Sequence, residues 1–149
     1  MYRLGIYVRA DIYYKRIARQ GRHDYSYSRT FDARMDVTAK EYRYFIWNGP
    51  VLPATCRLYR THIRAPLNIK AMRDAAARLT GKHDFSAFTA NPRREMGETV
   101  RKLDVLRIQR RGREITIVAR GEGFLYKMVR SLAGFLIKVG IGKMPPEDA

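Results

Sequence analysis

Two strands and a helix in the second half of the sequence are the feature that most constrains the fold. Residues 99–110 and 114–120 are rich in residues that favour strands, and Arg111-Gly112-Arg113 between them predicts a tight turn. From Phe124 to Val139 the apolar residues recur at helical spacing: Leu125, Met128, Val129, Leu132, Phe135, Leu136 and Val139. Each of these elements must bury one apolar face against another element. The segment therefore predicts helices packed on an antiparallel sheet.

The first half of the sequence adds elements of both kinds. Residues 42–47 predict a strand that ends in the turn Asn48-Gly49-Pro50, and residues 58–63 predict a second, shorter strand. A helix is expected to begin after Asn68, which serves as its N-cap, and to end at Gly81.

The remaining segments give weaker patterns. Residues 82–98 predict a loop with a helical turn near Asp84–Phe88. Residues 1–30 are rich in Tyr and Arg and have no clean period, so we treat them as a poorly determined lead-in to one domain at 31–149. The expected fold class is α+β, an antiparallel sheet packed by helices.

Composition excludes several classes of protein. The apolar runs are too short to span a membrane, and 46% hydrophobic with 30% charged residues fits a globular domain. Cys56 stands alone, which excludes an intrachain disulfide and favours a reducing, cytoplasmic setting. His23, His62 and His83 lack the spacing of metal ligands, so no metal site is expected.

The formal net charge of +16, from 30 Lys and Arg against 14 Asp and Glu, indicates a polyanionic partner. Neutralising phosphates releases condensed counterions and favours binding. Arginine suits phosphate recognition, and the ten tyrosines offer surfaces on which unpaired bases can stack. The alternative is a basic protein whose charge serves solubility alone.

Two polar positions stay open from the residues alone. His83 and Asp84 can form an acid–base pair, or Asp84 can cap the turn that follows it. Arg130 can meet a specific partner or a phosphate, or it can lie at the polar border of the predicted helix beside Lys127 and Lys138.

Several short motifs occur in an order that resembles the tRNA pseudouridine synthase A family. Phe31-Asp32-Ala33-Arg34 precedes Tyr42-Arg43-Tyr44, and a stretch at Gly81–Phe88 follows. The stretch Gly123–Arg130, with Gly134 and Val139-Gly140 beyond it, completes the set. The match runs from Phe31 to Pro146 and looks like the C-terminal half of such an enzyme.

The resemblance implies a pseudouridine synthase fold at 31–149 and a reaction that needs no cofactor. A uridine in the tRNA anticodon arm is flipped out, an aspartate attacks it, and the base is rejoined through carbon. Tyr42 matches the tyrosine that packs on the target base, and Arg130 matches the arginine that pairs with the catalytic aspartate. Arg93, Arg94, Arg101 and Lys127 become candidate phosphate contacts, or else solvated surface charges. The complete enzyme is expected to be a homodimer.

The resemblance also has departures. The catalytic aspartate of the family lies in an Arg-Thr-Asp-Ala-Gly motif upstream of a Phe-His-Ala-Arg element, and Phe31–Arg34 aligns with the downstream element. Asp32 and Asp36 are therefore not expected to be the nucleophile. We expect a partial family member, through truncation, frameshift or fragmentation, that binds RNA without isomerising uridine alone. The alternatives are a non-catalytic RNA-binding module of a ribonucleoprotein, or an aggregation-prone remnant with no function.

Overall fold

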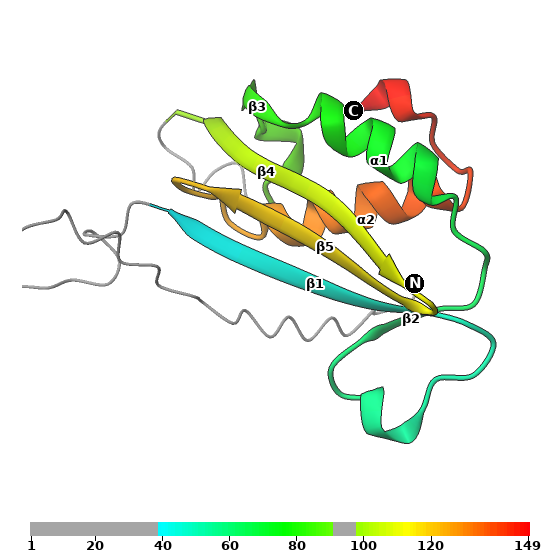
Figure 1. The fold of residues 1–149 in the computed structure, drawn as a ribbon. Helices are drawn as coiled ribbons and strands as arrows, with labels where there is room; N and C mark the ends of the chain where they lie inside the picture. The colour runs from blue at the N-terminus through cyan, green and yellow to red at the C-terminus, as the bar shows by residue number, and fades with distance from the viewer. Residues whose placement is uncertain (1–38, 91–97) are drawn as a thin grey trace, which may run out of the picture.

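The computed structural model describes residues 39–90 and 98–149 of the chain (Figure 1). The predicted lead-in at 1–30, the stretch Phe31–Asp36, and the candidate contacts Arg93 and Arg94 lie outside the described residues. The elements are, in chain order, β1 (Lys40–Asn48), the 3-10 turn η1 (Ala54–Cys56), β2 (Thr61–Ile63), α1 (Ile69–Arg78), β3 (Gly81–Asp84), η2 (Ser86–Phe88), β4 (Val100–Arg111), β5 (Glu114–Gly121), α2 (Met128–Gly140) and η3 (Pro146–Asp148).

The five strands form one sheet in the order β2-β1-β5-β4-β3, with α1 and α2 packed on one face (Figure 1). The predicted α+β class is confirmed. The sheet is mixed, because β2 runs parallel to β1 while the other three pairings are antiparallel. A parallel neighbour requires a crossover connection, and residues 49–60 supply it. The predicted strand at 58–63 is shorter than expected and starts at Thr61, because a turn occupies the preceding residues.

The hairpin of β4 and β5 lies at the centre of the fold, as predicted from residues 99–120. Gly112 has a φ of 59°, which the turn requires and which glycine adopts without steric cost. Gly121, at the end of β5, lies against the carbonyl oxygen of Lys102, so a Cβ at this position would collide with the backbone. A bulge between Leu103 and Val105 shifts the register there and increases the local twist.

The helix predicted after Asn68 is confirmed as α1. The Asn68 side-chain oxygen accepts a hydrogen bond from the Ala71 N–H at 3.1 Å, which satisfies one of the free donors at the helix start. The helix ends at Arg78 with Leu79 as its C-cap, and Gly81 has a φ of 116° where the chain enters β3. The prediction of a loop over 82–98 was therefore wrong at its start. The polar residues of β3 give no strand signal, because only pairing with β4 makes them a strand.

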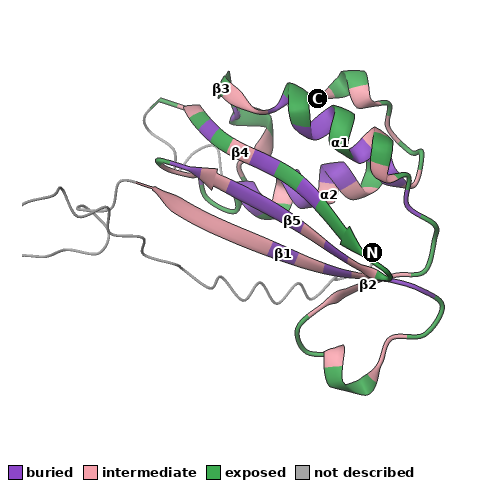
Figure 2. Cartoon of the chain, in the orientation of Figure 1, coloured by how far each residue is buried: buried purple, intermediate pink, exposed green. Residues whose placement is uncertain are grey.

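The apolar face predicted for the last helix is buried in the core (Figure 2). Gly140 permits the close approach of α1, because a Cβ there would lie 2.8 Å from Met72 Sδ and 2.9 Å from Leu67 Cδ2. The helix was predicted to begin at Phe124, but α2 begins at Met128. Residues 124–127 instead form an irregular corner, in which Lys127 is left-handed with a φ of 58°. Within 39–90 and 98–149, no helix combines the length and apolar character needed to cross a membrane.

Candidate functional site

Two of the predicted site residues, Tyr42 and Arg130, come from elements that pack against each other. Tyr42 lies in β1 and faces the helices, since it packs against the same core as Tyr44 and Ile46. Arg130 lies in the first turn of α2, which contacts β1. The site therefore forms on the helix-covered face of the sheet, toward the β1 side.

The Tyr42 ring is half-buried and fixed by one aromatic neighbour. The edge of one ring meets the face of the other, since Tyr42 and Phe124 have centroids 5.0 Å apart and an interplanar angle of 85°. This arrangement is favoured by the ring quadrupoles and orients the Tyr42 side chain. Phe124, which we predicted as the first residue of a helix, is instead a supporting residue of the candidate site. Phe124 packs against Tyr42 from outside α2, which begins at Met128 instead of at the predicted Phe124.

Tyr44 lies two residues along the same face of β1. Its hydroxyl shares a hydrogen bond of 2.8 Å with the hydroxyl of Thr61 in β2. Burial raises the pKa of Tyr44, while the Thr61 bond and the positive charge of Arg130 act in the opposite direction. The guanidinium of Arg130 therefore acts electrostatically on a β1 hydroxyl, although the two residues are far apart in the sequence.

The Arg130 side chain is exposed. Among residues 39–90 and 98–149 no carboxylate forms an ion pair with it. The first turn of α2 holds no acidic residue, and no side chain caps it. A cation in the first turn of a helix is unfavourable by about 0.3–1 kcal/mol, because the backbone dipole is positive there. An anion in this place would be stabilised by both the helix terminus and the guanidinium.

Lys127 lies at the N-cap of α2 and is the one non-glycine residue with positive φ in the described segments. Its ammonium lies 5.1 Å from the centroid of the Tyr126 ring. The Tyr126 carbonyl accepts hydrogen bonds from the Ala90 N–H at 3.2 Å and the Thr89 hydroxyl at 3.4 Å. These bonds tie the corner to the segment that follows η2 and hold Lys127 on the surface in a strained conformation.

Arg101 lies in β4, two strands away from β1. Its Nη1 donates to the carbonyl oxygens of Glu98 at 2.6 Å and Val100 at 2.8 Å. Part of its hydrogen-bonding capacity thus orders the start of β4. The structure does not bring Arg101 into contact with Tyr42 or Arg130.

Asp84 caps the turn after β3. Its Oδ1 accepts hydrogen bonds from the Thr99 hydroxyl at 2.6 Å and the Ser86 N–H at 2.9 Å. These bonds, chiefly that of Thr99, hold the pKa of Asp84 below its usual value. His83 Nε2 bonds to the Thr80 carbonyl at 3.1 Å. The capping interpretation of Asp84 is confirmed.

The residues that sequence reasoning missed are Phe124, Tyr44 and Thr61. The alternation of β1 was a usable signal, since residues two apart in a strand share a face and Tyr42 and Tyr44 therefore point the same way. The contribution of Thr61 had no local signal, because it depends on β2 lying beside β1. Across the two described segments, no three His, Cys, Asp or Glu side chains are grouped as a metal site would require.

Comparison with known proteins finds a matching family and similar relatives for this chain. A family described as "tRNA pseudouridine synthase" matches residues 75–149, which include the strands β3, β4 and β5 and the helix α2. The "tRNA pseudouridine synthase A" of Brevibacillus brevis is 42% identical over 119 residues, covering 80% of this chain and 48% of the relative. That of Chlamydia trachomatis serovar L2b is 44% identical over 117 residues, covering 78% and 43%. The chain thus spans about half the length of the curated relatives it matches.

Proposed function

The chain belongs to the tRNA pseudouridine synthase family, and we propose that it forms part of an enzyme that isomerises uridine in the tRNA anticodon arm. The observation that carries the proposal is that one face of β1 holds both Tyr42, backed by Phe124, and Tyr44, whose hydroxyl is under the influence of the positive charge of Arg130 at the start of α2. One group offers an aromatic surface for a base, and the other offers a positive charge for an anion. Both are needed where a flipped nucleotide meets a carboxylate.

Tyr42 is proposed to pack on the target uracil. Extruding a base from its stack costs a few kcal/mol. Stacking on an aromatic side chain contributes about 1–3 kcal/mol per base, which offsets much of that cost. Because Phe124 already fixes the ring, little side-chain entropy remains to be lost when the base arrives. Tyr42→Phe should therefore keep most of the tRNA affinity, while Tyr42→Ala should weaken binding by about 1–3 kcal/mol.

Arg130 is proposed to pair with the catalytic aspartate of the complete enzyme. A guanidinium within a few ångströms lowers a carboxyl pKa and keeps the aspartate ionised, as a nucleophile requires. The Arg-Thr-Asp-Ala-Gly motif that would carry this aspartate does not occur in the sequence. We therefore propose that these 149 residues bind tRNA but do not isomerise uridine by themselves.

The test is a reconstitution experiment. The chain alone is incubated with unmodified tRNA, and pseudouridine is quantified; it is then incubated together with the N-terminal half of the Brevibacillus brevis relative. We expect turnover only in the second mixture. Arg130→Gln should lower that turnover about a hundredfold, the scale seen when one electrostatic stabilising group is removed. Lys138→Gln, an equal charge loss at the exposed far end of α2, is the control. Robust turnover by the chain alone would contradict the absence of the nucleophile.

The second candidate is a non-catalytic RNA-binding module. It is favoured by the net charge of +16, which suits binding of a polyanion whether or not a reaction follows. Salt-dependent tRNA binding with no turnover, even after addition of the N-terminal half, would select it. If the complete protein is the enzyme of the first proposal, we propose that it is a cytoplasmic homodimer. The mass of the reconstituted complex, measured by analytical ultracentrifugation, tests this oligomeric state.

A further inference from the structure

A groove of about 510 Å³ lies at the outer edge of β4, beside the turn that joins β4 to β5. Its walls come from α1, which lies alongside β4 (Figure 1), and from the ends of both hairpin strands. Three arginines line it: Arg73 from α1, and Arg110 and Arg111 from β4. The candidate site at Tyr42 uses none of these residues.

Hydrogen bonds to the backbone hold two of the three arginines in place. Arg73 Nε donates to the Ile108 carbonyl at 3.2 Å, so its guanidinium is fixed against the strand edge. Arg110 Nε donates to the Gly112 carbonyl at 3.0 Å. Each uses one of five donors, which leaves the terminal nitrogens of both side chains for a ligand. This part of β4 has no strand partner beyond β5 in the described segments, because β3 pairs only with Val100–Leu103.

The charge of the groove is strongly positive. The single carboxylate in its lining, Glu114, already forms an ion pair of 2.8 Å with Arg60. Gln109 and Thr116 pair across β4 and β5 on the face of the sheet that carries Arg111, opposite to Ile108 and Arg110, so the groove follows the strand edge between the two faces; they add an amide and a hydroxyl as neutral hydrogen-bonding groups. Forked cationic donors beside neutral polar groups match the oxygens of a phosphate, since arginine binds phosphates in a bidentate manner.

The distance between the groove and Tyr42 limits how one RNA can contact both. In the register of the sheet, Leu106 of β4 shares a row with Tyr42, and Arg111 lies five residues further along β4. At about 3.3 Å per residue and about 4.8 Å per strand, the groove is about 17 Å along and about 10 Å across the sheet from Tyr42. One strand of a DNA duplex carries one phosphate for about every 3.4 Å of helix axis, so at these separations one RNA can contact both sites only through nucleotides several positions apart.

We propose that the groove formed by Arg73, Arg110 and Arg111 binds phosphate groups of an RNA backbone, as a second contact distinct from the Tyr42 site. This inference rests on RNA being the ligand in the proposed function. The groove contributes affinity and orientation rather than chemistry, because phosphate contacts position a nucleic acid without reading its bases.

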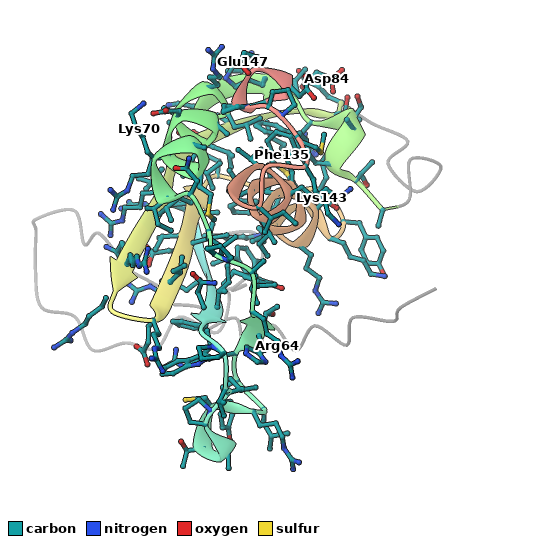
Figure 3. The ribbon with its side chains drawn as sticks, turned by 90° about the vertical axis from the view of Figure 1, so that its right-hand side faces the viewer. Arg64, Lys70, Asp84, Phe135, Lys143 and Glu147 are labelled. Carbon is teal, nitrogen blue, oxygen red and sulfur yellow. The ribbon has the colours of Figure 1, made fainter. Side chains whose placement is uncertain are left out.

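The test compares two double variants with equal charge loss. Arg110→Gln with Arg111→Gln removes two groove cations. Arg57→Gln with Arg64→Gln removes two exposed cations that precede and follow β2, the strand at the opposite edge of the sheet from β3 and β4; Figure 3 labels Arg64. Binding is measured by fluorescence anisotropy between 50 and 200 mM salt, with unmodified tRNA and with a 12-nucleotide oligocytidine that holds no uridine. Arg111→Gln alone, whose side chain makes no hydrogen bond in the described residues, guards against damage to the turn.

For single-stranded RNA each phosphate contact contributes about 0.7 to the salt slope, or about fivefold in affinity at 0.1 M salt. The groove double variant should therefore bind the oligocytidine about 25-fold more weakly, and the slope should fall by about 1.4. Arg111→Gln should lose about fivefold, and the control less than about threefold. Equal losses in the groove and control variants would overturn the inference, because only the overall charge would then matter.

Two further outcomes separate the inference from neighbouring explanations. If the reconstituted enzyme makes no pseudouridine while the groove variant still loses affinity for oligocytidine, the proposed function fails and the groove stands. If a polyglutamate peptide of equal charge displaces the oligocytidine as well as unlabelled RNA does, and this displacement depends on Arg110 and Arg111, the groove binds acidic protein and the inference is wrong.

Discussion

The strained residue Lys127 leads to a prediction in which stability and RNA binding change separately. A left-handed backbone costs a non-glycine residue about 1–2 kcal/mol. Lys127 has a φ of 58°, and the Tyr126 carbonyl beside it is tied to Thr89 and Ala90. Glycine relieves this strain but gives the unfolded chain more freedom, which costs about 0.4–1 kcal/mol. Lys127→Gly should therefore be more stable than Lys127→Ala by about 1 kcal/mol.

The comparison of these two variants isolates the backbone. Both lose the ammonium, its contact with the Tyr126 ring and its repulsion from the start of α2, so those effects cancel in the difference. Urea denaturation is the assay. With an m-value of about 2 kcal/mol/M, the midpoint of Lys127→Gly should exceed that of Lys127→Ala by about 0.5 M.

Binding of unmodified tRNA should behave differently. If Lys127 contacts a phosphate, both variants should lose about fivefold in affinity at 0.1 M salt, because both lose the same charge. Lys138→Ala, which removes an exposed cation from the last turn of α2, is the control. Equal midpoints for the glycine and alanine variants would refute the strain argument. Unchanged affinity in both would refute the assignment of Lys127 as a phosphate contact.

Substitutions at three other positions test the remaining parts of the fold. Asn68→Ala should destabilise the protein by about 1 kcal/mol through loss of the α1 cap, and Asn68→Asp should restore most of it; thermal melts measure both. Asp84 has a lowered pKa, so its stabilising effect is present above the ordinary pKa of about 4 and is lost as pH falls through the lowered value. Asp84→Asn should flatten this acid limb in urea titrations at several pH values, and an unchanged limb would contradict the cap. Tyr44 has a raised pKa, so stability should be intact below pH of about 10 and fall as pH rises toward the raised value; Tyr44→Phe should remove this fall, at a cost of about 1 kcal/mol at neutral pH for the lost Thr61 bond.

The sequence predicted the candidate site only in part. The resemblance assigned roles to Tyr42 and Arg130, whereas the helical pattern alone left Arg130 undecided. Neither indicated that Phe124 supports the Tyr42 ring, because the apolar spacing of residues 124–139 predicts an uninterrupted helix. The corner at Lys127 breaks that helix, and its backbone conformation is held by contacts with Thr89 and Ala90 that lie far away in the sequence.

The sequence by itself determined the elements whose signals are local. The hairpin of β4 and β5, the buried face of α2 and the cap of α1 follow from side-chain period, a glycine turn and one short polar residue. Tertiary structure decided the rest. Pairing with β4 makes the polar residues of β3 a strand, and β2 pairs parallel to β1. The packing of α1 beside β4 allows Arg73 to bond to the Ile108 carbonyl, which forms one wall of the groove. The physical reason is that strand pairing and side-chain reach depend on which segments become neighbours in space, and periodicity along the chain does not encode those neighbours.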